Sequence, residues 1–101
     1  MSHPSKTKGS NFERELVNEA RALGLDAERA YASNGKAFGE SEEVDIKVQG
    51  MRLQAKRRAR LPRFLMVPEG CDGTVFRSDR GETLVLMRWE DVMDKLKEEG
   101  W

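Results

Sequence analysis

The sequence predicts a single α/β domain in which a mixed β-sheet is flanked by helices. Two observations indicate this class. Apolar residues recur at helical spacing near both ends of the chain, and short runs of alternating apolar and polar residues occupy its middle. A length of 101 residues fits one domain, which we expect over residues 10–101, after a flexible basic arm at residues 1–9. Such a small domain has a modest core, which pairing with a second copy would enlarge.

The first expected element is a helix over residues 11–23. Ser10 would be its N-cap and Glu13 would complete a capping box, while Gly24 suits the position that follows the helix. One face of this helix is apolar and would pack against the core. The residues of this face are Phe12, Leu16, Ala20 and Leu23.

A β-hairpin is expected in the middle of the chain. Residues 25–32 read as extended, and a loop rich in Gly, Ser and Asn follows at 32–41. Apolar and polar residues then alternate over 44–48 and 51–57, on either side of a Gln-Gly turn. The core face of this hairpin would consist of Val44, Ile46, Val48, Met51, Leu53 and Ala55.

A two-residue turn fixes the register of this hairpin and gathers its polar side chains. Asp45 would lie directly opposite Gln54, with Cβ atoms about 5 Å apart. Lys56 would lie one step farther along the same face, opposite Glu43. A carboxylate, an amide and an ammonium group would therefore surround one point.

The second half of the chain predicts four further elements. Pro62 suits the first turn of a helix and Pro68 blocks its continuation, so we expect residues 61–67 to form a short helix, with a strand as the alternative. Strands at 74–78 and 83–87 would form a second hairpin, and residues 89–99 a final helix. The expected order of elements is therefore α-β-β-β-α-β-β-α.

Charge is unevenly distributed along the chain. The 18 basic residues balance the 18 acidic ones overall, yet residues 44–63 carry seven basic residues against one acid. The segments 11–43 and 89–101 are both net acidic. A basic patch on an otherwise acidic protein indicates local phosphate binding, with an ordinary solvated charged surface as the alternative.

The composition also indicates a compartment. Cys71 is the single cysteine, so the chain forms no internal disulfide and has no Cys/His cluster of the zinc type. No apolar run approaches the roughly 20 residues that a membrane span needs. The N-terminal residues lack the apolar core of an export signal. We therefore expect a reduced, cytoplasmic location and no membrane partner.

The polar groups of the central hairpin suit phosphodiester hydrolysis. That reaction needs a divalent metal held by oxygen ligands, an activated water, and compensation of phosphate charge. A carboxylate such as Asp45, facing an acid two residues before a lysine on the next strand, meets these needs. Lys56 is such a lysine, but Gln54 stands where an acid would be the more useful ligand.

Four parts of the chain together resemble the archaeal and phage Holliday junction resolvases, which belong to the PD-(D/E)xK nuclease superfamily. They are KGSNFERELV at 8–17, Arg29 before the run SNG, Asp45, and QAK at 54–56. The hairpin TVFRSDRGETLVLM at 74–87 is similar to a later hairpin of the family. The resemblance implies the PD-(D/E)xK nuclease fold and cleavage of four-way DNA junctions. It also implies a requirement for Mg²⁺, with Mn²⁺ as an alternative, and a homodimer.

The resemblance also implies a role for individual residues. The catalytic residues would be Glu13, Arg29, Ser33, Asp45, Gln54 and Lys56. Three of them, Glu13, Asp45 and Gln54, would bind the metal. Lys56 would be the catalytic lysine, and Arg29 would lie near the scissile phosphate. Contacts with DNA would come from Lys6, Lys8, Arg14, Arg29, Arg57, Arg58, Arg60 and Arg63.

Gln54 departs from the family pattern, in which most members have Glu. A glutamine can bind a metal through its carbonyl oxygen but brings no negative charge, so metal affinity should fall. Glu42 or Glu43 would offset this loss. The alternatives are a nuclease that acts on other DNA structures, a non-catalytic DNA-binding module, and a small interaction protein.

A homodimer would place two active sites in C2 symmetry, which matches the two cleavage positions of a junction. The second hairpin and the final helix would form the subunit surface, because they are rich in apolar residues. These residues are Val85, Met87, Trp89 and Met93.

Overall fold

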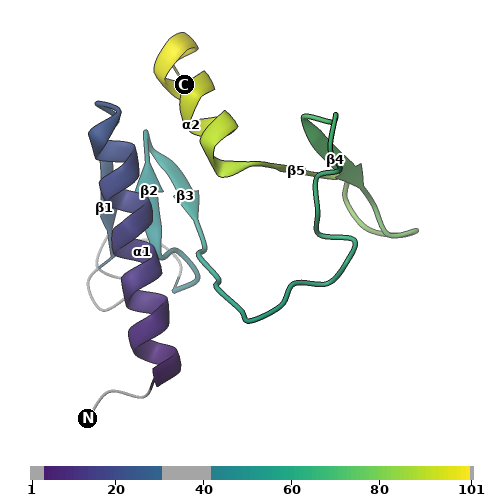
Figure 1. Ribbon diagram of the computed structural model, residues 1–101, viewed down its shortest axis with the longest axis horizontal. Coiled ribbons are helices and arrows are strands. Elements are labelled where there is room, and N and C mark those ends of the chain that lie inside the picture. Colours follow the sequence, from purple (N-terminus) through teal and green to yellow (C-terminus); the bar gives the residue numbers. More distant parts are fainter. Residues whose placement is uncertain (1–3, 31–41, 101) are drawn as a thin grey trace.

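The structure is a computed structural model that describes residues 4–30 and 42–100. The described chain forms two helices and two separate antiparallel sheets (Figure 1). The first sheet has the strand order β1-β2-β3 and the second pairs β4 with β5. The elements are α1 (Pro4–Ala22), β1 (Ala27–Arg29), β2 (Ile46–Val48), β3 (Met51–Leu53), β4 (Gly73–Phe76), β5 (Leu84–Met87) and α2 (Trp89–Glu99).

Helix α1 begins earlier than the sequence predicts. It starts at Pro4, where proline is tolerated because the first helical residues need no amide partner within the helix. Residues 4–9, expected as part of a flexible arm, are therefore helical, and the predicted N-cap at Ser10 is wrong. Ser10 lies within α1, and its hydroxyl accepts a hydrogen bond from Arg29 Nη2 at 3.2 Å. A tertiary contact thus uses the side chain that the local pattern assigned to capping.

The end of α1 agrees with the prediction. Gly24 has a φ of 85°, a left-handed conformation that glycine adopts without a steric penalty. Its amide donates to the Arg21 carbonyl at 2.9 Å, and the Leu25 amide donates to the Ala20 carbonyl at 3.1 Å. This pair of hydrogen bonds is the Schellman motif, which reverses the chain and directs it toward β1.

The hairpin of β2 and β3 has the predicted register. Val48 pairs with Met51, Lys47 with Arg52, and Ile46 with Leu53. Gln49 and Gly50 have φ values of 51° and 81°, the left-handed pair that a two-residue hairpin turn of type I′ requires. Strand β1 pairs antiparallel with the other edge of β2.

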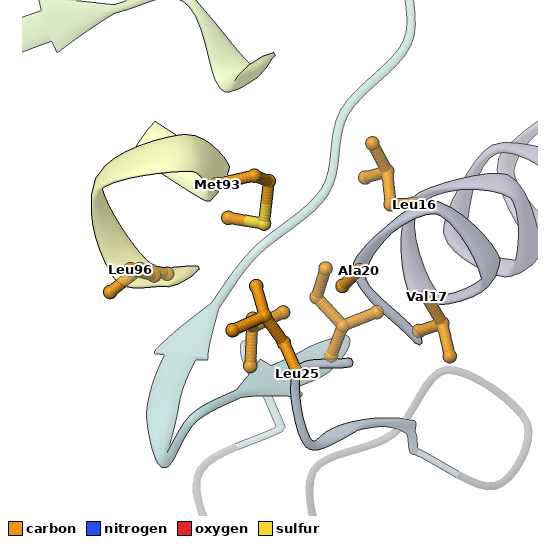
Figure 2. Close-up of a cluster of buried hydrophobic side chains, with 8 residues drawn as sticks. Leu16, Val17, Ala20, Leu25, Met93 and Leu96 are labelled. Atoms are coloured by element: carbon orange, nitrogen blue, oxygen red, sulfur yellow. The ribbon is translucent and has the colours of Figure 1, made fainter. Parts of the chain in front are cut away.

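The core lies between α1, the three-stranded sheet and α2 (Figure 2). Ile46 and Val48 of β2 are fully buried, and Met93 and Leu96 of α2 close over them. Val44 is buried as expected, whereas the predicted core residues of β3 are partly buried and pack against the edge of this cluster. The remaining buried members are Leu16, Val17, Ala20 and Leu25.

The predicted helix at 61–67 is wrong, and so is its strand alternative, because neither forms in this segment. A helix this short depends on burying an apolar face, whereas Leu61, Phe64 and Met66 are all exposed. The Phe64 ring packs edge-on against Phe76, with centroids 6.3 Å apart. The chain between β3 and β4 is an irregular connection with turns at Pro62–Leu65 and Pro68–Cys71.

The prediction of one mixed sheet is also wrong for the described residues. Strands β4 and β5 pair with each other and not with β1–β3, and every recorded pairing is antiparallel. The second hairpin therefore forms as predicted, with slightly shorter strands, but projects away from the three-stranded sheet (Figure 1). Val75 and Val85, which face each other across it, remain 69% and 63% exposed.

Helix α2 has the predicted bounds and the predicted apolar face. Met93 is 1% exposed and belongs to the core, so it is not available for the expected subunit surface. Trp89 and Val92 are partly buried against the same cluster. Within residues 4–30 and 42–100, no helix combines the length and the apolar character needed to cross a membrane.

Candidate active site

Glu13 is the one buried charged residue among the described positions, with a relative exposure of 4%. It lies on the core-facing side of α1, where Arg29 of β1 reaches it: Arg29 Nε is 3.7 Å from Glu13 Oε1. The same guanidinium also donates to Ser10, one helical turn earlier. Arg29, the last residue of β1, thus ties the end of this strand to α1 through Glu13 and Ser10.

Asp45 directly precedes β2, the strand that pairs with β1. Arg29 pairs with Ile46 across the β1–β2 ladder, and the next residue, Ala30, donates its amide to the Asp45 carbonyl at 2.9 Å. The sheet therefore brings Arg29 next to the residue that the sequence predicts as the main metal ligand. The positions are 16 residues apart along the chain, and strand pairing alone joins them.

The predicted pairing of Asp45 with Gln54 does not form as part of the ladder. Leu53 is the ladder partner of Ile46, yet its carbonyl also accepts the Asp45 amide at 2.9 Å. Two residues of one strand thus oppose one residue of the other, which is the pattern of a β-bulge. Bulges redirect side chains, and here Asp45 Oδ2 accepts the Ala55 backbone amide at 2.8 Å.

Gln54 contacts a different carboxylate. Its Nε2 donates to Glu43 Oε2 at 2.6 Å, so the amide and this acid meet just beyond the paired part of the hairpin. Both side chains are exposed, whereas Asp45 is half-buried. At this end of the hairpin Gln54 therefore bonds to Glu43, while Asp45, its predicted partner, bonds to the Ala55 backbone.

Lys56 follows these residues on an exposed stretch of chain. Together with Gln54, it helps to line a groove of about 810 Å³ that is otherwise mostly apolar. Phe12 of α1, Trp89 of α2 and Met87 of β5 contribute to the same groove. The site therefore opens beside a space between the three-stranded sheet and the second hairpin.

The predicted DNA-contacting residues of the connection after β3 are all exposed. They make no recorded ion pair with any described residue, and their charge faces solvent. Arg14 is likewise exposed, on α1. Lys6 and Lys8 lie in α1, and Ser33 lies outside the described residues. The predicted DNA contacts after β3 are Arg57, Arg58, Arg60 and Arg63, and the predicted catalytic Lys56 just before them is also exposed.

Few side chains are suited to holding a metal. The described part of the chain has no group of three or more His, Cys, Asp or Glu residues arranged to do so. The nearest set is Asp45, Glu43 and the carbonyl oxygen of Gln54. One or two carboxylates suffice for Mg²⁺ when waters and phosphate oxygens complete its coordination. The donor types therefore fit a magnesium ion that is bound together with a phosphate.

Sequence reasoning missed the contact between Arg29 and Glu13. The acids nearest to Arg29 in the sequence are Glu28 and Asp26. The acid that Arg29 meets lies on another element. The one available signal was that Glu13 interrupts the apolar face of the first helix between Phe12 and Leu16.

The fold and the site define a small mixed α/β protein with two helices and two antiparallel sheets, and with an acidic and amide cluster at the end of its central hairpin. Comparison of the chain with family models, curated proteins and solved structures found no match.

Proposed function

We propose that the protein is a metal-dependent, structure-selective endonuclease that cleaves four-way DNA junctions, as a Holliday junction resolvase of the PD-(D/E)xK type. One observation carries the proposal. Arg29, which forms the ion pair with Glu13, directly precedes Ala30, whose amide bonds to the Asp45 carbonyl, and the Asp45 side chain accepts the Ala55 amide beside Gln54. Residues of α1, β1 and the central hairpin, all of which the resemblance assigns to one active site, therefore lie in neighbouring elements.

In this mechanism, Asp45 and the Gln54 carbonyl oxygen would hold Mg²⁺, or Mn²⁺ in its place. Such an ion supplies Lewis-acid stabilisation of the phosphate oxygens. Lys56 orients the attacking water and offsets the negative charge that develops on the phosphate. Arg29 binds a phosphate oxygen and, through its contact with Glu13, keeps its guanidinium in a fixed place.

DNA binding would depend mainly on the phosphate backbone. The exposed cations of the connection after β3 support this, because they form no ion pair with residues 4–30 or 42–100 that a phosphate would have to break. Contacts of this kind carry no base information, so affinity should depend on the branched shape and steeply on salt. A cytoplasmic location would follow from access to DNA.

A C2 homodimer would supply one active site for each of the two strands to be cut. The support is the amount of apolar surface left exposed on the second hairpin and the connection before it, which a small monomer has no reason to display. The residues concerned are Leu61, Phe64, Met66, Val75, Leu84 and Val85.

The test is cleavage of a labelled four-way junction and of a linear duplex of the same sequence, with Mg²⁺, with Mn²⁺, and with chelator. Paired symmetric nicks in the junction alone are expected. Cleavage of both substrates would instead indicate a nuclease acting on other DNA structures. The variant K56A is the matched control for contaminating nuclease, because Lys56 is exposed and its loss leaves the core intact.

A non-catalytic DNA-binding module is the second candidate. Two observations favour it: Gln54 stands where an acid would bind metal, and the described residues lack a three-acid cluster. In that case the junction would be bound and protected but never cut, with either metal. Tight binding without nicks, at protein concentrations that saturate the junction, would select this candidate.

A further inference from the structure

We propose that Glu43 supplies the negative charge that Gln54 lacks, and that Gln54 is a positioning residue for Glu43. This inference rests on the proposed nuclease function. Its starting observation is the 2.6 Å hydrogen bond from Gln54 Nε2 to Glu43 Oε2. A hydrogen bond to an ionised carboxylate is short and strong, so it holds the acid in one orientation.

The direction of this hydrogen bond assigns both ends of the glutamine side chain. Because Nε2 faces Glu43, the carbonyl oxygen Oε1 points the other way and keeps its capacity to bind a cation. The Glu43 carboxylate has two oxygens and about four acceptor positions, one of which accepts the Gln54 amide proton. The pair thus offers an acid and an amide oxygen together.

Glu43 lies close to Asp45 through the chain itself. It stands two residues before Asp45, and the two acids bond to consecutive residues of the opposite strand, Gln54 and Ala55. Two carboxylates at this end of the hairpin restore the charge that an aspartate and a glutamate on facing strands would provide. Metal affinity depends on that charge count.

Glu13 is less suited to replace the missing charge. Its side chain is 5% exposed and Arg29 lies 3.7 Å away, so the arginine charge already offsets that of the carboxylate. Glu43 is exposed, and ions and phosphates can reach it without any rearrangement of the core. This difference in burial selects Glu43 over Glu13 as the second acid.

A charge-exchange experiment tests the inference on the full chain. Calorimetric titration with Mn²⁺, in the absence of DNA, measures metal affinity separately from cleavage. We expect E43Q to weaken Mn²⁺ binding by about tenfold or more. The double variant E43Q/Q54E places the acid on the other strand and restores the amide–carboxylate pair, so its affinity should return to near that of the native protein. E42Q removes a neighbouring exposed acid and should leave Mn²⁺ affinity unchanged.

Three results would overturn the inference. If the native protein binds Mn²⁺ and cleaves junctions, and E43Q does both equally well, Glu43 has no part in the metal site while the nuclease function stands. If E43Q lowers only the melting temperature, the pair is structural. If the native protein neither binds Mn²⁺ nor cleaves any DNA, the proposed function fails and the inference fails with it. Circular dichroism of each variant verifies that it is folded.

Discussion

Arg29 Nε lies 3.7 Å from the Oε1 atom of Glu13, and this contact joins the sheet to the first helix through the most buried acid of the described chain. Removing one member of a buried ion pair leaves the other charge without compensation in a poorly solvated place. The contact is therefore expected to matter for stability as well as for the site.

The variant R29A should lower the free energy of unfolding by about 3 kcal/mol, because the buried Glu13 carboxylate would lose the positive charge that compensates it. The double variant R29A/E13Q should be more stable than R29A alone. Denaturant unfolding of the two variants measures the difference. R14A, which removes an exposed arginine of the same helix, is the control and should change stability by no more than about 0.5 kcal/mol. Equal stability of R29A and R14A would contradict this interpretation.

Two substitutions should separate the structural role of Asp45 from its catalytic role. In D45N, the side chain keeps an oxygen that can accept the Ala55 amide but loses its charge. We expect D45N to stay folded and to lose junction cleavage by about 100-fold or more. D45A also loses the hydrogen bond and should be less stable than D45N by about 1 kcal/mol. Undiminished cleavage by D45N would remove Asp45 from the site.

For a substitution of Gln54 we predict a gain in metal affinity, where the substitution of Asp45 should cause a loss of cleavage. Q54E places a second carboxylate against Glu43, where the two negative charges repel each other until a cation binds. Stability without metal should fall, whereas Mn²⁺ affinity should rise and cleavage should be kept or increased. Thermal melts with and without Mn²⁺ measure both effects together. A variant that gains no stability from Mn²⁺ would show that this end of the hairpin does not bind metal.

The exposed arginines after β3 should act on DNA through charge alone. R58A should weaken binding to the junction and lower the slope of log affinity against log salt by about 1. R80A, which removes an exposed arginine of the β4–β5 loop, is the control and should leave the slope unchanged. Fluorescence anisotropy over a salt series measures both slopes. Identical slopes for the two variants would place the phosphate contacts elsewhere.

The exposed valines of the second hairpin provide a test of the dimer. V85E puts a charge on a residue that is 63% exposed, so the hairpin itself should still form. Light scattering coupled to gel filtration should show a dimer for the native protein and a monomer for V85E. A native protein that stays monomeric at high concentration would rule out this surface as a subunit contact.

The sequence predicted best where neighbouring residues decide the conformation. The central hairpin, its register and the end of the first helix followed from alternation, a two-residue turn and one glycine. The final helix followed from its apolar spacing. The predictions failed where a local signal competed with a distant contact. Ser10 resembled a cap but bonds to Arg29, and residues 61–67 resembled a helix but leave Leu61, Phe64 and Met66 exposed.

The sequence by itself therefore determined which segments are strands and helices near the site, and which residue types gather at the end of the central hairpin. Only the tertiary structure decided that Glu13 meets Arg29, that Asp45 binds the Ala55 backbone, and that Gln54 meets Glu43. The physical reason is that turns and periodicity act within a few residues. Pairings across a bulge or between a helix and a strand depend instead on how whole elements pack.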